Sequence, residues 1–451
     1  MALSTSIPSA KSFGNDFLWG VVTAAAQNEG AVYTDGRTAS VWDTFAKRAG
    51  KIKGAAKPTV ACDFYHRYKD DLLMVKALGF KVFRFSISWS RVLPEGTGRI
   101  NKEGIQFYNQ VIDECLKLDL VPFVTLYHWD LPQVLEKEGG WTSYKILNWF
   151  ARFATVCAEA FGDRVKNWII LNEPMAFTSL GYMLGKHAPG KTGMKNFLPA
   201  VHHAVLAQAD GGRIIRSHVK GANIGTSFSC SEINPYSGRT EDVKAAHRID
   251  ILMNRLFIEP ALGKGYPRDD FTFLEQLEMT NKAWKYTERM SFDFDFIGLQ
   301  NYFPITVKHN AIIPVIQASE VKASARKVAH TAMGWEVNAE SFYRIIRRFW
   351  KYGSVRQIII TENGAAYKDE LKNSSVHDLQ RIEYFKDHIS ALYKAKQKGI
   401  NIGGYFAWTL MDNFEWAEGY KAKFGLVHVD HETQLRTIKD SGYWFRDFLD
   451  A

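Results

Sequence analysis

Ile358-Ile359-Ile360-Thr361-Glu362-Asn363-Gly364 is a stretch that combines a buried strand with an acidic residue at its end. Three consecutive β-branched apolar residues are typical of a strand buried on both faces of a parallel sheet. The polar and small residues that follow do not continue such a strand, so the chain is expected to leave the sheet at Glu362. In a parallel α/β barrel the carboxyl ends of the strands carry the chemistry. Glu362 is therefore a catalytic candidate, although on its own it is equally a glutamate of a surface loop.

A second stretch repeats the pattern. Trp168-Ile169-Ile170-Leu171-Asn172-Glu173-Pro174 is again an apolar run that ends in a glutamate, and Pro174 ends the strand because proline has no N–H to donate to a sheet. The chain thus offers two glutamates at two strand ends. Glycoside hydrolysis needs such a pair, because one neutral carboxylic acid protonates the leaving oxygen and one carboxylate attacks or stabilises the anomeric carbon.

These two segments, with the separation between them, resemble family 1 glycoside hydrolases, the β-glucosidase family. The resemblance extends from about Phe17 to the C-terminus. It implies a retaining β-glycosidase in which Glu362 is the nucleophile and Glu173 is the acid and base. It also implies terminal β-glucosyl residues of small glycosides and oligosaccharides as substrates, with galactosyl and fucosyl residues as further candidates.

Strand candidates and helical patterns alternate eight times along the chain. The strand candidates are residues 17–22, 82–86, 121–126, 168–173, 223–227, 296–300, 358–362 and 402–408. Between them, apolar residues spaced three and four apart, as from Phe342 to Phe349, predict helices. This alternation fits either a doubly wound sheet or a (β/α)8 TIM barrel. The family resemblance favours the TIM barrel, an α/β fold with its active site at the C-terminal ends of the strands.

Length and composition predict one large globular domain. The chain has 451 residues, of which 46% are hydrophobic and 23% are charged, and a barrel with insertions can use more than about 400 residues as one domain. No linker, tandem repeat or low-complexity tract interrupts the alternation. We expect a frayed or disordered tail over residues 1–14 and a single glycoside hydrolase domain over residues 15–451.

The N-terminus favours a cytoplasmic location. Residues 1–14 contain neither a charged segment followed by an apolar one nor a long apolar span. Cys62, Cys115, Cys157 and Cys230 lie far apart among apolar neighbours, so we expect core thiols. The sequence leaves the oligomeric state open.

The formal net charge of +9 is compatible with a polyanionic partner, but the lysines and arginines are interleaved with acidic residues. We therefore expect a solvated surface, with neither nucleic acid nor membrane as a partner. Clustered Cys and His ligands, a phosphate-binding glycine loop and a dinucleotide fingerprint are all absent from the sequence. No metal and no cofactor are expected, and the expected partner is a small-molecule β-glycoside or oligosaccharide.

The resemblance also implies a set of sugar-binding residues near the strand ends. The matching motifs include Thr125-Leu126-Tyr127-His128-Trp129-Asp130-Leu131-Pro132 and the segment from Ala407 to Trp416. Tryptophan faces pack against a pyranose ring, and Glu415 can accept hydrogen bonds from two neighbouring hydroxyls. Trp335 is expected to form the aglycone wall, or else to be one more core tryptophan. The substrate-binding residues implied are Gln27, His128, Trp129, Asn172, Tyr302, Trp335, Trp408, Glu415 and Trp416.

Three further residues are expected to support the site. The resemblance places Arg84 beneath the nucleophile, where a cation favours the ionised carboxylate, although an arginine that neutralises some other core carboxylate would look the same in the sequence. Gln300 stands where the family more often has asparagine, and Phe424 belongs to a matching Phe-Gly-Leu segment. With Tyr302 and Arg84 beside it, Glu362 should stay charged, whereas Glu173 should hold its proton to higher pH.

Rival functions remain open on the sequence alone. One is a sugar-binding relative without turnover, and another is an enzyme of the same fold that mainly transfers glycosyl groups. Glu415 favours a plain glucoside over its 6-phosphate, because relatives that act on phosphorylated sugars carry serine at the matching position. Lys421 and Lys423 lie close by in the sequence and are alternative phosphate ligands, or else they point to solvent.

Overall fold

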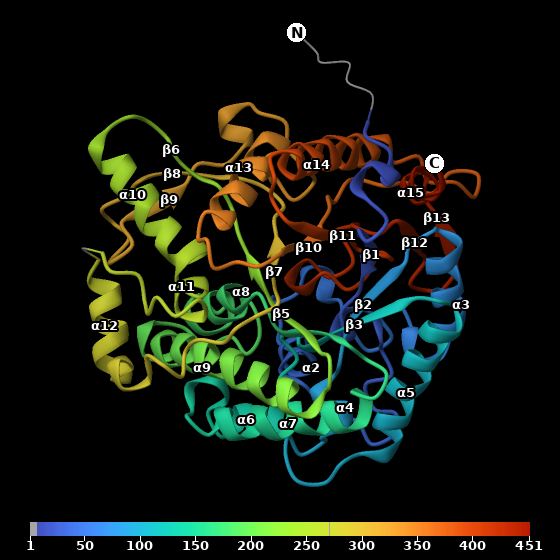
Figure 1. The fold of residues 1–451 in the computed structure, drawn as a ribbon, viewed down its shortest axis with the longest axis horizontal. Helices are drawn as coiled ribbons and strands as arrows, with labels where there is room; N and C mark the ends of the chain where they lie inside the picture. The colour runs from blue at the N-terminus through green and yellow to red at the C-terminus, as the bar shows by residue number, and fades with distance from the viewer. Residues whose placement is uncertain (1–6, 270) are drawn as a thin grey trace.

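The computed structural model describes residues 7–269 and 271–451, and at its centre is a closed barrel of eight parallel strands (Figure 1). Each strand pairs with its neighbours in chain order, and β1 pairs with β11 to close the barrel. The predicted TIM barrel is confirmed, and all eight predicted strands are present with ends within two residues of those observed. The barrel strands are β1 (Leu18–Val22), β2 (Val82–Ser86), β3 (Val121–Tyr127), β4 (Asn167–Asn172), β5 (Asn223–Ser229), β7 (Phe296–Gln300), β10 (Ile358–Asn363) and β11 (Ile402–Trp408).

Helices surround the barrel, as Figure 1 shows. The longer ones are α3 (Phe64–Ala77), α5 (Lys102–Lys117), α7 (Ile146–Phe161), α9 (Met194–His218), α10 (Thr240–Asp250), α12 (Thr272–Asn281), α13 (Ala339–Trp350), α14 (Leu379–Gln397) and α15 (Asp440–Asp450). Helix α13 illustrates why they form: Asn338 caps its first turn by accepting a hydrogen bond from the Ser341 N–H at 3.0 Å, and the predicted stripe from Phe342 to Phe349 is buried.

Shorter elements lie in the loops that join strands to helices. The short helices are α1 (Ala25–Asn28), α2 (Val41–Phe45), α4 (Trp89–Val92), α6 (Gln133–Lys137), α8 (Pro174–Thr178) and α11 (Ile258–Ala261). One small sheet contains β6 (Ile233–Pro235), β8 (Ile305–His309) and β9 (Ala318–Glu320). Another contains β12 (Val427–Val429) and β13 (Arg436–Ile438). Two π-helical segments, Ser179–Met183 and Ile251–Arg255, follow β4 and β5 in the chain.

The inside of the barrel is a packed core. Its apolar side chains include Val82, Phe123, Ile169, Phe296, Ile359 and Phe406. The Phe123 ring centroid lies 5.0 Å from that of Phe406. Gly225 makes room for this packing, because a Cβ at that position would lie 2.3 Å from the ring of Phe296. The interior is therefore filled, so a ligand site on the barrel axis has to lie at an end of the barrel.

The N-terminal segment is more ordered than the sequence suggests. Ala10–Phe13 forms a 3₁₀ helix, and Phe13 is buried with its ring 5.0 Å from that of Trp19 and 5.2 Å from that of Tyr393. The prediction of a frayed tail over residues 1–14 is therefore wrong for residues 10–13, because Phe13 anchors this segment against β1 and α14. Residues 1–6 of that predicted tail lie outside the described residues.

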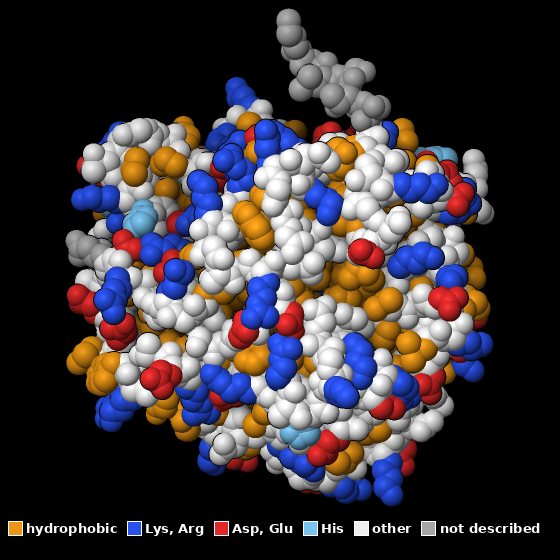
Figure 2. Space-filling model, viewed as in Figure 1, with side chains coloured by type: hydrophobic (Ala, Val, Ile, Leu, Met, Phe, Trp, Pro, Cys, Tyr) orange, Lys and Arg blue, Asp and Glu red, His pale blue; other side chains and the backbone are white. Residues whose placement is uncertain are grey.

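The surface carries charges of both signs. Figure 2 shows Lys and Arg side chains intermingled with Asp and Glu side chains over one face of the molecule. All four cysteines are buried and unpaired, which confirms the predicted core thiols. Within the described part of the chain, no helix combines the length and the apolar character needed to cross a membrane.

Candidate active site

A cavity of about 330 Å³ lies where β4, β10 and β11 end. It brings together most of the residues predicted to act on a sugar. Those lining it are Glu173, Glu362, His128, Trp129, Tyr302, Trp335, Trp408, Glu415, Trp416 and Phe424. The other predicted residues, namely Gln27, Arg84, Asn172 and Gln300, are buried behind this lining and hydrogen-bond to residues that form it.

Glu362 is held at both carboxylate oxygens. Its Oε1 accepts a hydrogen bond from Arg84 Nη1 at 2.7 Å and another from Gln300 Nε2 at 2.7 Å. Its Oε2 accepts one from the Tyr302 hydroxyl at 2.7 Å. The Arg84 guanidinium and the Glu362 carboxylate are both almost fully buried, so their ion pair is little screened by solvent. The carboxylate is thus fixed in one orientation at the edge of the cavity.

Asn172 links this cluster to the next strand end. Its Oδ1 accepts hydrogen bonds from Arg84 Nη2 at 2.5 Å and from Gln300 Nε2 at 2.7 Å. Its amide nitrogen lies 3.1 Å from Nε2 of His128. Burial, with Arg84 as a second cause, lowers the pKa of His128 well below its ordinary value. The ring is therefore neutral, and it accepts this hydrogen bond at Nε2 and carries its proton on Nδ1.

Glu173 occupies an unusual backbone position. Its φ of 46° is in the left-handed region, which a non-glycine residue adopts at a cost and which recurs at active sites. The Glu173 N–H donates to the Ser227 carbonyl at 2.9 Å, and Pro174 begins α8 immediately afterwards. This turn from β4 into α8 directs the Glu173 side chain to the cavity that Glu362 also lines.

Aromatic rings and a third carboxyl form another part of the cavity. Trp129 and Trp416 stack with ring centroids 4.6 Å apart, and His128 lies 6.0 Å from Trp408. Gln27 Nε2 donates to Glu415 Oε2 at 3.2 Å. Flat apolar faces beside a hydrogen-bonding carboxyl suit a sugar ring, which has apolar faces and a polar edge.

The three carboxyls in the cavity differ in their electrostatic surroundings. Burial and the charge of Glu362 raise the pKa of Glu173 well above its usual value. Burial also raises the pKa of Glu362 above its usual value, and Arg84 and Tyr302 offset part of this rise. Burial, with the Glu362 charge as a second cause, raises the pKa of Glu415 to about 8. Because Arg84 and Tyr302 favour the charged form of Glu362, this carboxylate carries the negative charge of the Glu362–Glu173 pair and Glu173 holds the proton.

Known proteins are similar to this chain in sequence and in fold. The family model described as Glycosyl hydrolase family 1 matches residues 9–451. The chain belongs to glycosyl hydrolase family 1. It is accordingly a retaining O-glycoside hydrolase. Beta-glucosidase A from Thermotoga maritima is 42% identical to this glycosidase over 441 residues, which are 97% of this chain and 98% of that protein.

Two further relatives show the range of similarity. The solved structure of the beta-glucosidase from Thermotoga maritima in complex with glucoimidazole is 41% identical to this family 1 glycosidase, covers 98% of each chain and has a TM-score of 0.90. A 6-phospho-beta-galactosidase from Clostridium acetobutylicum is 34% identical and covers 96% of each chain. Family membership is thus clear, whereas the choice of sugar needs an argument from this cavity.

Apolar residues that sequence reasoning largely missed also line the glycosidase cavity. Phe303 stacks on Trp335 with ring centroids 4.7 Å apart and planes 17° apart. The apolar residues that line the cavity include Met175, Leu180, Met253, Phe303, Met333 and Trp335. Met175 and Phe303 stand next to predicted site segments, so proximity in sequence is the signal that could have found them. Leu180 and Met253 belong to the π-helical segments and carry no such signal.

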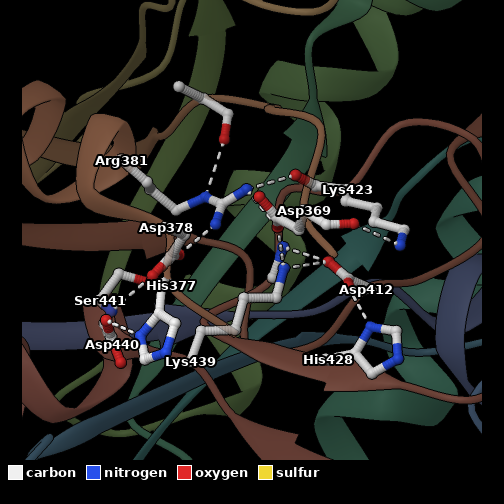
Figure 3. A network of polar contacts seen from close by, with 12 residues as sticks. Asp369, His377, Asp378, Arg381, Asp412, Lys423, His428, Lys439, Asp440 and Ser441 are labelled. Atoms are coloured by element: carbon white, nitrogen blue, oxygen red, sulfur yellow. Dashed lines mark hydrogen bonds and ion pairs between the residues drawn. The ribbon is translucent and has the colours of Figure 1, made fainter. Parts of the chain in front are cut away.

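A buried ionic network holds two loops of the glycosidase site together (Figure 3). Lys439, at the start of α15, donates to Asp412 Oδ1 at 2.7 Å and to Asp369 Oδ2 at 2.5 Å. Arg381 of α14 donates to Asp369 at 2.8 Å and to the Ala365 carbonyl at 3.0 Å. Asp412 lies in the loop that carries Glu415, and Ala365 and Asp369 follow Glu362 along the chain. The network therefore ties the segment after β10 to the segment after β11.

Removal of the Lys439 charge is expected to destabilise the protein. Lys439→Met leaves Asp369 and Asp412 with one cation fewer in a buried site, and the loss of one partner from a buried ion pair typically costs about 3–5 kcal/mol. Urea unfolding followed by tryptophan fluorescence measures the change in the free energy of unfolding. Lys394→Met is the matched control, because Lys394 pairs with Glu340 at the surface, where a pair contributes about 0–1 kcal/mol. Equal losses in the two variants would contradict this account of the network.

Proposed function

We propose that this glycosidase is a β-glucosidase that hydrolyses small β-glucosides by double displacement, with Glu362 as nucleophile and Glu173 as acid and base. One observation carries the proposal: Glu362 is held by Arg84 and Tyr302 in the same cavity as Glu173, and its charge raises the pKa of Glu173. The names of the relatives support glucose as the sugar. Initial rates on p-nitrophenyl β-glucoside, β-galactoside and β-fucoside test the proposal, and the highest kcat/KM is expected for the glucoside.

In the first step, the Glu362 carboxylate attacks the anomeric carbon and forms a glycosyl ester. The bond from this carbon to the leaving oxygen breaks, and Glu173 supplies the proton that the leaving oxygen needs. The hydrogen bonds from Arg84, Gln300 and Tyr302 keep the carboxylate oriented, so little reorganisation is needed in the transition state.

In the second step, Glu173 acts as a base. Esterification removes the negative charge of Glu362, which is one of the causes that raise the pKa of Glu173. The pKa of Glu173 therefore falls, and its carboxylate can accept a proton from the incoming water. Water attacks the anomeric carbon, the ester bond to Glu362 breaks, and the second inversion restores the β configuration.

Recognition of the glucosyl ring falls to the residues around Glu415. We assign contacts with the sugar hydroxyls to Gln27, Glu415, His128 and Asn172, because Glu415 and His128 line the cavity and Gln27 and Asn172 hydrogen-bond to them. Trp408, Trp416 and Trp129 supply apolar faces for the ring.

A β-glucoside is expected to be a better substrate than its 6-phosphate. No lysine or arginine lines the cavity among the described residues, whereas Glu173, Glu362 and Glu415 do. Lys421 is exposed, and the Lys423 ammonium donates to the Asp369 carbonyl at 3.0 Å. A phosphate of charge about −1.5 to −2 would therefore be buried beside the Glu362 carboxylate without a cation to balance it.

Like-charge contact of this kind costs several kcal/mol, which corresponds to at least about 100-fold in kcat/KM. Steady-state kinetics on p-nitrophenyl β-glucoside and its 6-phosphate measure the difference directly. A higher kcat/KM for the phosphorylated substrate would overturn the role given to Glu415.

Two wider expectations also remain proposals. We propose a cytoplasmic location, which the four buried, unpaired thiols support, because a reducing compartment keeps cysteines in this state. We also propose that residues 15–451 fold as one domain, which the pairing of the first and last barrel strands supports.

A further inference from the structure

The loop that carries Glu415 is closed at its base by a buried carboxylate, that of Asp412. We infer that Asp412 is a positioning residue for glucose recognition: it joins the two ends of this loop and thereby fixes the Glu415 carboxyl against the sugar. Asp412 does not line the cavity, so it acts through the loop and not by contact with the substrate. The inference rests on the proposed function.

Residues 412–425, which we term the Glu415 loop, supply a large share of the cavity lining. The residues of this loop that line the cavity are Glu415, Trp416, Ala417, Glu418 and Phe424. The loop follows β11 and leads to β12, and the Asp412 N–H donates to the Val427 carbonyl at 2.9 Å where its two ends meet. The placement of the lining residues therefore depends on how the base of the loop is held.

The Asp412 side chain bridges that base. Its Oδ1 accepts a hydrogen bond from the Gly425 N–H at 2.9 Å. A Cβ at Gly425 would lie 2.2 Å from the Asp412 nitrogen, so only glycine allows the two ends to approach this closely. Lys439 donates to the same Oδ1 at 2.7 Å, and Oδ2 lies 3.3 Å from Nδ1 of His428 (Figure 3). The carboxylate thus joins both ends of the loop to residues beyond it.

The surroundings of Asp412 keep it ionised. Burial alone would raise the pKa of Asp412. Lys439, the hydrogen bond with His428 and the charge of Arg381 outweigh burial and hold this pKa below its ordinary value. Asp412 therefore contributes in two ways, because its charge balances Lys439 and its Oδ1 accepts the hydrogen bond from Gly425 that closes the loop.

The position of Glu415 follows that of the loop. Glu415 lies three residues after Asp412 and is partly exposed to solvent. Its N–H donates to the Gly419 carbonyl at 2.7 Å, so its backbone is bonded within the loop itself. Gln27 holds the loop from the other side, because its carbonyl accepts from the Phe414 N–H at 3.0 Å. A shift at the base of the loop is therefore carried to the Glu415 carboxyl.

Mutant cycles with Glu415 test whether Asp412 acts through that residue. Asp412→Ala removes the acceptor for the Gly425 N–H. It should lower kcat/KM on dinitrophenyl β-glucoside at least about 10-fold, because a misplacement of about 1 Å can cost about 100-fold. In a Glu415→Ala background the same change should lower kcat/KM less than about 3-fold, because the contact that Asp412 fixes is already lost. The reactive leaving group keeps the weakest variant measurable.

A conservative variant separates positioning from stability. Asp412→Asn keeps an oxygen that can accept the hydrogen bond from Gly425, but it loses the charge that balances Lys439. It should therefore recover most of the kcat/KM that Asp412→Ala loses, to within about 3-fold of the wild type, while the free energy of unfolding falls. Urea unfolding measures the second quantity.

Asp378→Ala is the matched control. Asp378 is a buried aspartate of the same network, but it accepts hydrogen bonds from the Ser441 N–H at 2.8 Å and the Ser441 hydroxyl at 2.6 Å, outside residues 412–425. Its loss should lower the free energy of unfolding and leave kcat/KM within about 3-fold of the wild type, whether or not Glu415 is present.

Gly425→Ala disturbs the same closure without a change of charge. The added Cβ would meet the Asp412 nitrogen, so the two ends of the loop must move apart. We expect kcat/KM to fall at least about 10-fold with Glu415 present and less than about 3-fold in the Glu415→Ala background. This variant decides the question if circular dichroism shows that Asp412→Ala is unfolded.

The possible outcomes separate the inference from the proposed function. If Asp412→Ala and Gly425→Ala keep the wild-type kcat/KM, or lower it equally with and without Glu415, Asp412 serves stability alone. The inference is then wrong while the β-glucosidase activity stands. If Asp412→Asn is as impaired as Asp412→Ala, the role of the Gly425 contact is also wrong. If the wild type hydrolyses no β-glucoside, the proposed function itself is wrong and the inference falls with it.

Discussion

Glu362→Ala is expected to lower kcat on β-glucosides by at least about 10⁴-fold, because without this carboxylate no covalent route to the product exists. The carboxylate is positioned by three hydrogen bonds, from Arg84, Gln300 and Tyr302. Rates on p-nitrophenyl β-glucoside measure the loss, and circular dichroism confirms that the variant is folded. Glu340→Ala is the control, since Glu340 is a half-exposed carboxylate on α13 and its loss should leave kcat nearly unchanged.

Azide distinguishes the loss of a nucleophile from general damage. In Glu362→Ala a small anion can occupy the space of the missing carboxylate and attack the anomeric carbon once, with a single inversion. The expected product is therefore α-glucosyl azide, formed at a rate that rises with azide concentration. Turnover close to that of the wild type without azide, or a β-configured azide product, would show that Glu362 is not the nucleophile.

Glu173→Ala is expected to affect substrates according to their leaving groups. An alkyl alcohol leaves poorly without a proton, so the glycosylation step of an alkyl glucoside should slow about 10³- to 10⁴-fold. Dinitrophenolate leaves without protonation, so the same step should slow less than about 10-fold for dinitrophenyl glucoside. Single-turnover kinetics on the two substrates separate this step from the later attack by water.

The azide product provides an internal comparison with the first variant. In Glu173→Ala the covalent ester on Glu362 still forms from dinitrophenyl glucoside, and azide then displaces it with a second inversion to give β-glucosyl azide. Opposite anomers from the two variants would assign the two roles independently of rate. Equal slowing of the glycosylation step for both leaving groups would show that Glu173 is not the proton donor.

The sequence was most informative where a polar residue interrupts an apolar run. Glu362 and Glu173 stand out because each ends a buried strand, and the structure brings both to one cavity. Their electrostatic difference was also predictable in direction, because Arg84 and Tyr302 contact Glu362 as expected. The sequence marked Gln300 as unusual, yet only the coordinates reveal that its single amide nitrogen lies 2.7 Å from both Asn172 and Glu362.

Other features depend on contacts between distant parts of the chain. Phe13 lies in a polar segment that looks frayed, but it packs against Tyr393 of α14, which the sequence does not connect with it. Leu180 and Met253 resemble ordinary core residues until the π-helical segments place them beside the cavity. Lys439 looks like a surface charge in the sequence, whereas its side chain is fully buried between two aspartates. Tertiary packing decides each of these cases.

Covalent trapping tests the central claim most directly. In a 2-deoxy-2-fluoro-β-glucoside with a dinitrophenyl leaving group, the fluorine slows both the formation and the hydrolysis of the glycosyl ester. The good leaving group restores the rate of ester formation only, so the ester accumulates. Proteolysis and mass spectrometry then locate the added fluoroglucosyl mass. The proposed mechanism predicts one label per chain, on Glu362 in the peptide that contains Thr361-Glu362-Asn363-Gly364. A label on Glu173 or Glu415, or continued hydrolysis of β-glucosides with no label on any residue, would contradict it.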